Sequence, residues 1–458
     1  MKTLFWVLLL VTCAAHAASG ATLSFGPFGE LILRGREENP GMITILLSDA
    51  EGWGSVEEEM AKVAGDAGAL VIGVDMKRYF GHIEQKQYEP NVSHELEAMS
   101  KYVQKTLALP KLRAAVLMGH GAGGGVVYAS LVQAPVQTFL GGVSLGFRPG
   151  LPVTQPFGVG RGLLWKRLEK EIRYDAVTNL ELSWTVIQAA QDPTFPEASA
   201  REFIQGMDGV TLYSLPGAQG YADTAAWNGT LGQALNAYIA TPFDQPDQSR
   251  DIADLPLIEV PPTGPPTDSL AVFITGDGGW AGIDKDIAGI LAKNGIGVVG
   301  LDSLRYFWTR RTPAGGGADL ARIMRHYLDA WDKKRVVLIG FSLGADALPP
   351  MAANLPPELR QAVRQVTLLA PSKYVELEFH VSDWMHDDEA GQDIALLPEV
   401  RKLEPVPMLC VYGQDEEQSL CMDLRPDEAT IKSLPGSHHF NGEYAKVAAL
   451  ILEHLKLP

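Results

Sequence analysis

The sequence has 458 residues, of which 38 are Lys or Arg and 55 are Asp or Glu, so its formal net charge is −17. A chain of this length predicts two or three domains, because a single domain usually holds about 100–200 residues. The acidic balance argues against nucleic acid as the main ligand, since phosphate binding requires clustered Lys and Arg. It would also repel anionic lipid headgroups at long range.

The N-terminus has the pattern of a secretory signal peptide over residues 1–17. Lys2 supplies a positive start, residues 4–11 form an apolar stretch, and residues 15–17 (Ala-His-Ala) form a small-x-small cleavage site. The apolar stretch is too short to span a bilayer. A lipoprotein box ending at Cys13 is the alternative, but threonine before that cysteine fits such a box poorly. We therefore expect an exported protein, with lipid anchoring as the less favoured alternative.

Prolines mark a boundary near the middle of the chain. Seven of them lie between positions 242 and 266: Pro242, Pro246, Pro256, Pro261, Pro262, Pro265 and Pro266. Because proline lacks the backbone N–H that helices and central strands need, residues 241–268 are predicted to form an extended linker. The linker separates a domain at 22–240 from a domain at 268–458.

The two halves share an internal repeat. Residues 52–80 align without gaps with residues 279–307 at a constant offset of 227, and ten of the 29 positions are identical. Both segments predict a strand, a glycine turn, a helix and a second strand. Apolar runs alternate with helical stretches throughout, which indicates an α/β fold with a mostly parallel sheet in each half.

The second half contains a nucleophile motif. Residues 340–344 read Gly-Phe-Ser-Leu-Gly after the apolar run 336–339. Glycines on both sides of Ser342 permit the tight strand-to-helix turn that exposes a serine hydroxyl. The first half repeats the pattern as Gly-His-Gly-Ala-Gly at 119–123, with Gly121 in place of the serine.

A glycine-rich loop at 276–280 (Gly-Asp-Gly-Gly-Trp) follows the predicted strand 270–274. The backbone N–H of Asp277 or Gly278, together with that of Leu343, would form an oxyanion hole. A phosphate-binding loop is the alternative, but the Lys-Ser/Thr ending of a P-loop is absent.

The acid and the base are predicted near the C-terminus. The strand 406–412 ends at an acidic loop, where spacing from Gly413 selects Glu416, with Asp415 as a close second. His438 or His439 then completes the chain order Ser, acid, His, and spacing favours His438. No Cys or carboxylate at ligand spacing joins the two histidines, so we expect no metal site, and this chemistry needs no cofactor.

The first half serves as a comparison for these assignments. At its equivalent C-terminal segment, residues 215–221 read Leu-Pro-Gly-Ala-Gln-Gly-Tyr and contain no histidine, while Gln191-Asp192 resembles Gln414-Asp415. Nucleophile and base are therefore absent together. The sequence predicts two tandem α/β-hydrolase-like domains, of which the first is catalytically degenerate.

Cysteine usage fits an exported protein. Removal of the signal peptide takes Cys13 and leaves Cys410 and Cys421. An even count favours a disulfide, with two buried thiols as the alternative. The two cysteines bracket the acidic loop, so a disulfide would hold the acid in place.

Four segments of the second half, at 276–280, 302–308, 340–346 and 436–440, together resemble the AcvB/VirJ family of bacterial virulence-associated proteins. VirJ-type members look like the second half alone, and AcvB-type members have both halves. The resemblance implies a periplasmic serine hydrolase that releases the amino acid from aminoacylated phosphatidylglycerol, notably the lysyl form. It also implies membrane phospholipid as the partner, and an envelope or type IV secretion protein as a further candidate. Ser437 departs from the glycine expected there.

An aminoacyl ester carries an ammonium beside the scissile carbonyl, so a nearby carboxylate would favour it. Asp277 and Asp346 are the candidates; for Asp346, a favourable charge in the first turn of a helix is an equally good interpretation. Trp308, Arg310 and Arg311 follow a strand end and are candidates for binding the glycerol and phosphate of the lipid.

Two other functions fit the same residues. One is a periplasmic esterase or thioesterase with another substrate, because a Ser-acid-His triad does not define the acyl group. The other is a non-catalytic scaffold linked to secretion or virulence.

Overall fold

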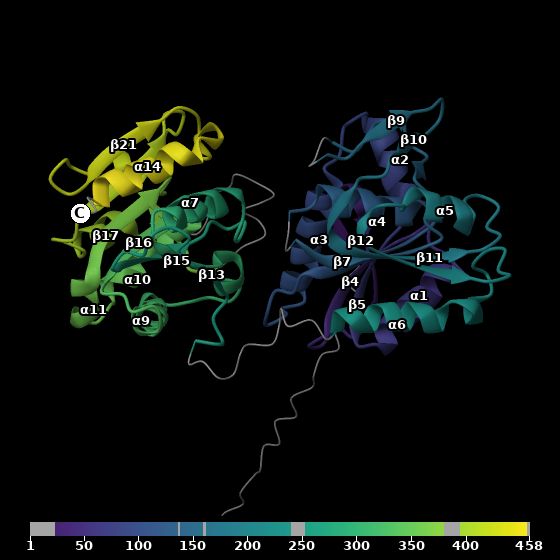
Figure 1. The fold of residues 1–458 in the computed structure, drawn as a ribbon, viewed down its shortest axis with the longest axis horizontal. Helices are drawn as coiled ribbons and strands as arrows, with labels where there is room; N and C mark the ends of the chain where they lie inside the picture. The colour runs from purple at the N-terminus through teal and green to yellow at the C-terminus, as the bar shows by residue number, and fades with distance from the viewer. Residues whose placement is uncertain (1–22, 136–137, 159–161, 240–251, 380–393, 456–458) are drawn as a thin grey trace, which may run out of the picture. The chain divides into compact units, whose positions relative to one another are not determined.

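The computed structural model describes residues 23–135, 138–158, 162–239, 252–379 and 394–455. The predicted signal peptide at 1–17 lies outside these residues. The chain forms two compact units, labelled by element in Figure 1. The first unit comprises residues up to Val103, Ala115–Ala134 and Phe139–Leu235, and the second comprises Gln104–Ala114, Pro135–Thr138 and Asn236–Pro458.

A seven-stranded sheet forms the centre of the first unit, in the order β12-β11-β7-β6-β4-β5-β3. Neighbouring strands are parallel except for β3 and β5. The strands are β3 (Ile32–Gly35), β4 (Met42–Leu47), β5 (Ala69–Val74), β6 (Ala115–His120), β7 (Phe139–Leu145), β11 (Asn179–Ala189) and β12 (Asp208–Leu215). The helices are α1 (Ser55–Asp66), α2 (Met76–Lys86), α3 (Val92–Thr106), α4 (Ala122–Gln133), α5 (Glu197–Phe203) and α6 (Asn228–Ile239), and the last residues of α3 and α6 belong to the second unit. All residues of β4 and β5 are buried, as expected of parallel strands covered on both faces.

The second unit repeats this architecture in the order β13-β15-β14-β16-β17-β20-β21, and only β13 is antiparallel to its neighbour. The strands are β13 (Leu257–Val260), β14 (Ser269–Ile274), β15 (Gly297–Leu301), β16 (Arg335–Phe341), β17 (Val363–Leu369), β20 (Met408–Gly413) and β21 (Thr430–Leu434). The helices are α7 (Gly282–Lys293), α8 (Ser303–Tyr306), α9 (Pro313–Ala330), α10 (Leu343–Ala353), α11 (Pro357–Ala362), α13 (Leu396–Arg401) and α14 (Tyr444–Leu455).

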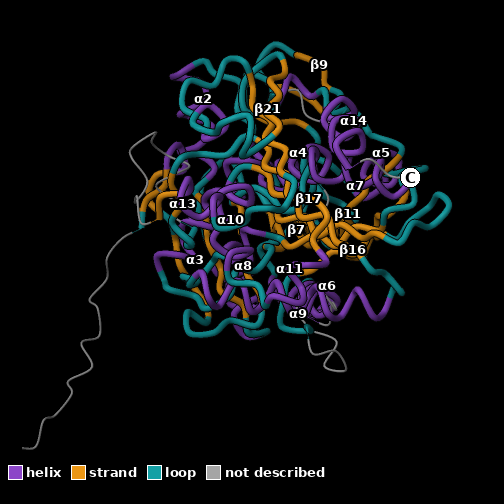
Figure 2. Tube along the Cα trace, turned by 90° about the vertical axis from the view of Figure 1, so that its left-hand side faces the viewer, coloured by secondary structure: helices purple, strands orange, loops and turns teal. Residues whose placement is uncertain are grey.

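Two apolar cores lie on opposite faces of this second sheet. One packs α9 and α10 against the strands, and the other packs α7 and α14 against them. Figures 1 and 2 both show α7 and α14 on one side of β16 and β17, with α9 on the other side. The alternation of apolar runs and helices in the sequence therefore produces the predicted α/β layers.

The sequence repeat corresponds to α1, β5 and the start of α2 in the first unit and to α7, β15 and α8 in the second. The strands β4 and β14 end just before it, so the repeat holds one strand in each unit where the sequence predicted two. A shared aspartate explains part of the identity, because Asp75 accepts hydrogen bonds at the start of α2 and Asp302 does so at the start of α8. Strand β13 lies inside the segment 241–268 that the sequence predicts as a linker, of which residues 241–251 lie outside the described part. An edge strand tolerates neighbouring prolines, so the proline signal did not distinguish it from a linker.

Within the described residues, no helix is long and apolar enough to cross a membrane.

Candidate active site

Ser342 lies at a sharp turn between β16 and α10. Its backbone has φ 52° and ψ −123°, and Gly121 of the first unit, between β6 and α4, has nearly the same values of 55° and −115°. A left-handed φ costs a residue with a side chain about 1–2 kcal/mol, and such strain is typical of functional sites. Both units therefore form the predicted turn, and only the second unit places a hydroxyl on it.

The start of α10 is pressed against the loop that follows β14. A Cβ on Gly344 would lie 2.1 Å from the carbonyl oxygen of Ile274, so only glycine allows this approach. Leu343, the first residue of α10, is thereby brought beside the loop that contains Asp277 and Gly278. The N–H groups predicted to form an oxyanion hole thus come from two segments that pack together.

The first unit shows where such N–H groups converge. A single oxygen, Oδ1 of Asp49, accepts hydrogen bonds from the N–H of Ala50 at 2.7 Å, from the N–H of Ala122 at 2.9 Å and from Nη2 of Arg148. Ala50 corresponds to Asp277 by the repeat offset of 227. Ala122 corresponds to Leu343 because each is the residue that follows the turn. The carboxylate of Asp49 occupies the place of an oxyanion, and this correspondence favours Asp277 over Gly278 as the donor in the second unit.

The two units differ at a pair of neighbouring positions: the first unit has Asp49 and Gly121 where the second has Gly276 and Ser342. In the first, a Cβ on Gly121 would lie 2.5 Å from Cγ of Asp49. In the second, Gly276 stands at the position of Asp49, and a Cβ there would lie 3.4 Å from Cβ of Ser342. Asp49 thus takes the space that a nucleophile would need. Sequence reasoning missed Asp49, although the offset of 227 places it opposite Gly276.

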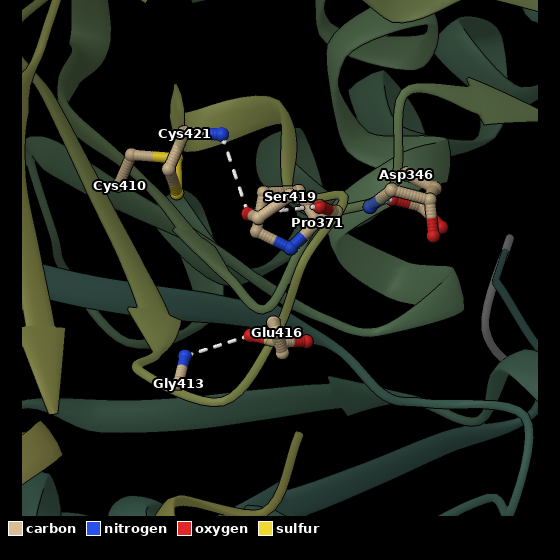
Figure 3. Close-up of a disulfide and its surroundings, with 8 residues drawn as sticks. Asp346, Pro371, Cys410, Gly413, Glu416, Ser419 and Cys421 are labelled. Atoms are coloured by element: carbon tan, nitrogen blue, oxygen red, sulfur yellow. Dashed lines mark hydrogen bonds between the residues drawn. A yellow bond between two sulfur atoms is a disulfide. The ribbon is translucent and has the colours of Figure 1, made fainter. Parts of the chain in front are cut away.

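Glu416 and His438 are joined by a hydrogen bond of 2.9 Å between Oε1 of the carboxylate and Nδ1 of the ring. The other carboxylate oxygen accepts from the N–H of Gly413 at 2.7 Å (Figure 3). The hydrogen bond between Glu416 and His438, together with the charge of Glu416, raises the pKa of His438 above its usual value of 6.5. The carboxylate therefore fixes the orientation of the ring through Nδ1.

The alternative acid, Asp415, and the alternative base, His439, are more exposed than Glu416 and His438. Asp415 is exposed, and its N–H donates to the carbonyl of Gly436, which braces the acidic loop against the histidine segment. His439 is exposed, and partial desolvation together with the charge of His438 lowers its pKa. The ring of Phe341, the residue before Ser342, lies 5.3 Å from the His438 ring and 5.6 Å from the His439 ring. The histidine pair thus packs beside the turn that holds Ser342.

The cysteines form the predicted bridge, since Cys410 and Cys421 are joined by a disulfide across 11 positions of sequence. Cys410 lies on β20, whose last residue, Gly413, holds Glu416. On the other side, Ser419 Oγ accepts from the N–H of Cys421 and donates to the carbonyl of Pro371 (Figure 3). The acidic loop is therefore tied at both ends, to β20 and to the segment after β17.

Asp346 is buried one helical turn after Ser342, with 7% of its surface exposed. Its Oδ1 accepts from the N–H of Ser372 at 2.6 Å, and burial raises its pKa to about 7. In the described part of the chain, no Lys or Arg forms an ion pair with it. Its own N–H donates to the carbonyl of Ser342, as in any first turn of a helix. Sequence reasoning missed Ser372 as its partner.

The other candidates for substrate binding differ in exposure. Trp308 is 2% exposed and donates to the carbonyl of Leu109, which belongs to the same unit, so packing accounts for its position. Arg311 lies over the ring of Tyr306 at 4.7 Å. The side chain of Arg310 is 60% exposed and pairs with Glu376 at 3.3 Å.

The first unit keeps the position of the acid but not that of the base. The N–H groups of Ala190 and Gln414 make equivalent bonds, to the carbonyls of Leu215 and Leu434 respectively. Asp192 therefore stands at the position of Glu416, one residue away from the alignment that the sequence suggested. Gln219 occupies the position of His438.

Within the described residues, no group of three or more His, Cys, Asp or Glu side chains is placed to hold a metal ion. The two sheets and their strand–turn–helix connections define two tandem α/β-hydrolase-like domains with mostly parallel sheets. The chain belongs to the bacterial virulence protein (VirJ) family, whose model matches residues 41–139 and 268–457, more than half of the sequence.

Several solved structures are similar to parts of this chain. Est1E from Butyrivibrio proteoclasticus is 16% identical, with a TM-score of 0.34, over 44% of this chain and 94% of its own. MenH from S. aureus is 14% identical, with a TM-score of 0.35, over 44% and 99%. An alpha-beta serine hydrolase homologue from Coxiella burnetii is 18% identical, with a TM-score of 0.31, over 43% and 90%. Among curated proteins, none matches the sequence.

Proposed function

We propose that this protein is a periplasmic serine esterase that hydrolyses the aminoacyl ester of aminoacyl-phosphatidylglycerol, with the lysyl form as the preferred substrate. Ser342 acts as nucleophile, His438 as base and Glu416 as the acid that orients it. The disulfide supports an oxidising compartment, in agreement with the predicted signal peptide at 1–17.

In the first half of the reaction, Oγ of Ser342 attacks the ester carbonyl carbon while Nε2 of His438 takes its proton. The N–H groups of Asp277 and Leu343 stabilise the oxyanion, and each such donor typically contributes a factor of about 10²–10³ in rate. When the intermediate collapses, His438 returns the proton to the glycerol oxygen and phosphatidylglycerol leaves. Water activated by His438 then attacks the acyl-enzyme, which releases the free amino acid and regenerates Ser342.

The observation that carries the substrate assignment is the environment of Asp346. Asp346 is a buried carboxylate with no Lys or Arg partner among the described residues, so its ionised form is costly and burial raises its pKa to about 7, against the opposing effect of His438. A substrate ammonium beside the scissile carbonyl would supply a permanent positive charge and favour the ionised form. Arg310 is the candidate for the lipid phosphate, because a guanidinium pairs well with phosphate, and binding would require Arg310 to exchange its ion pair with Glu376 for that phosphate.

The test is release of free lysine from vesicles that contain lysyl-phosphatidylglycerol, measured by mass spectrometry. We expect release by the mature protein and by Ser214→Ala, which changes an exposed serine of the first unit, and a loss of roughly 10³-fold or more with Ser342→Ala. No release by the wild type would exclude this substrate and favour another acyl ester or a scaffold role.

A second substrate tests the role of Asp346. Acetylation of the α-amino group removes the charge beside the carbonyl, and we expect it to lower kcat/KM by about 10–100-fold, the usual worth of a charged hydrogen bond. Asp346→Asn should lower the rate on the free amine by a similar factor and have little effect on the acetylated substrate. Equal losses on both substrates would show that Asp346 supports the helix and does not bind the ammonium.

A further inference from the structure

Each unit has a buried carboxylate at the third position of one helix. Glu57 in α1 and Asp284 in α7 correspond at the repeat offset of 227, and their exposed fractions are 3% and 1%. One oxygen of each caps its helix: it accepts from the N–H of Gly54 at 2.9 Å in the first unit and from that of Ala281 at 3.1 Å in the second. The two carboxylates differ in what their second oxygen contacts.

In the first unit, the second oxygen of Glu57 has two partners. It accepts from the N–H of Asp49 at 3.2 Å and lies 2.7 Å from Nδ1 of His120. The carboxylate thus joins the start of α1 to the loop after β4 and to the last residue of β6. Ala50, whose N–H points at the oxyanion position, directly follows the residue that Glu57 holds.

In the second unit, the positions of both partners are changed. Gly276 and Phe341 stand where the first unit has Asp49 and His120, and phenylalanine has no ring nitrogen. Aspartate is also one methylene shorter than glutamate, so its carboxylate ends about 1.5 Å further from the loop. Oδ1 of Asp284 has no hydrogen-bond partner among the described residues, and the N–H of the buried Gly276 has none there either.

The N–H of Gly276 belongs to the glycine-rich loop that carries the oxyanion donor, which we call the oxyanion loop. The carbonyl of Gly276 shares a peptide with the N–H of Asp277, and it accepts from the N–H of Gly279 at 3.1 Å and from Oγ1 of Thr275 at 3.0 Å. Because a trans peptide points its N–H away from its carbonyl, the orientation of Gly276 sets the direction of the Asp277 N–H. By correspondence with the first unit, the N–H of Gly276 itself points toward Asp284.

We propose that an ordered water bridges the N–H of Gly276 and Oδ1 of Asp284, and that Asp284 positions the oxyanion loop through this water. A buried donor and a buried acceptor that are too far apart for a direct hydrogen bond by about one methylene are typical partners of an internal water. Burial raises the pKa of Asp284 to about 7, against the opposing hydrogen bond from Ala281. The carboxyl group can therefore either accept from the water or donate to it near neutral pH.

This inference rests on the proposed esterase function, because it makes Asp284 a positioning residue for the oxyanion donor at Asp277. Capping of α7 accounts for Oδ2 of Asp284 and leaves the buried Oδ1 without a role. In the first unit, Glu57 reaches the loop with its own carboxylate and needs no water.

The first test is a crystal structure of the mature protein at a resolution that shows ordered water. We expect one water within hydrogen-bond distance of both the nitrogen of Gly276 and Oδ1 of Asp284. In Asp284→Glu, the longer side chain should displace this water and accept directly from Gly276, as Glu57 accepts from Asp49. No water between the two atoms in the wild type, or a water that remains in Asp284→Glu, would overturn the proposal.

The second test is turnover of a soluble ester. Asp284→Ala removes the bridge, and we expect kcat to fall by roughly tenfold or more with little change in KM, because a misplaced oxyanion donor weakens binding of the transition state alone. Asp284→Glu should keep kcat close to the wild-type value. Glu57→Ala is the matched control, because it removes the equivalent cap and loop contact from the first unit. It should lower the free energy of unfolding and leave kcat unchanged.

The kinetic outcomes separate positioning from simple support of the helix. An unchanged kcat in Asp284→Ala, or equal losses in Asp284→Ala and Asp284→Glu, would overturn the positioning role. A wild-type protein that turns over no ester would contradict the proposed esterase function instead, and the crystal structures would decide on the water independently of activity.

Discussion

The pair formed by Glu416 and His438 determines how activity should depend on pH. The general base must be neutral, and the hydrogen bond and charge of Glu416 raise the pKa of His438 above 6.5. Activity should therefore fall as the pH decreases through a value above 6.5. Glu416→Gln removes the charge, so we expect the midpoint of this fall to move to lower pH and the maximal rate to fall by roughly 10³–10⁴-fold. The measurement is kcat/KM for a soluble ester between pH 5 and pH 9.

The neighbouring carboxylate provides the control. Asp415 is exposed and contributes its backbone N–H to the carbonyl of Gly436. Asp415→Asn keeps that N–H, so both the midpoint and the maximal rate should stay near the wild-type values. A large loss in Asp415→Asn with little change in Glu416→Gln would show that the acid had been assigned to the wrong residue.

Among the larger elements, the loop that carries Glu416 depends on the disulfide between Cys410 and Cys421. Replacing both cysteines by serine removes a cross-link that closes 11 positions, which corresponds to about 2–3 kcal/mol of unfolding free energy. We also expect kcat to fall, because the loop is held between β20 and the segment at Pro371. Denaturant titration and ester turnover measure the two effects. A lower stability with unchanged kcat would show that the hydrogen bonds alone position Glu416.

The turn of the first unit should be coupled to Asp49. Gly121→Ser places a Cβ against the carboxylate and adds a side chain at a left-handed φ, so we expect about 2–4 kcal/mol of destabilisation. Asp49→Gly recreates the pair found at Gly276 and Ser342, and it should recover about 1–3 kcal/mol of this loss in the double variant. A double-mutant cycle from denaturant titrations measures the coupling. Strictly additive effects would show that Asp49 does not occupy the space of a nucleophile.

For the molecule as a whole, local patterns in the sequence predicted the architecture. They did not predict contacts between residues that lie far apart in the sequence. The repeat and the glycine-flanked Ser342 predicted two sheets and the strained turn, because strand periodicity and glycine requirements are local properties. The choice between adjacent residues, such as Glu416 and Asp415, depends on the direction of a side chain at the end of a strand. The partner of Trp308 lies 199 residues away in the sequence, so its burial had no local signal.

The two units together should provide one reactive serine per chain. The first unit has Gly121 and Gln219 where the second has Ser342 and His438, and its oxyanion position is filled by Asp49. A fluorophosphonate should therefore add one adduct to the folded wild-type protein and none to Ser342→Ala, as measured by intact-protein mass spectrometry. Asp49→Gly should also give a single adduct, because it empties the oxyanion position without supplying a nucleophile. Two adducts on the wild type, or one on Ser342→Ala, would reveal a second nucleophile outside the candidate active site.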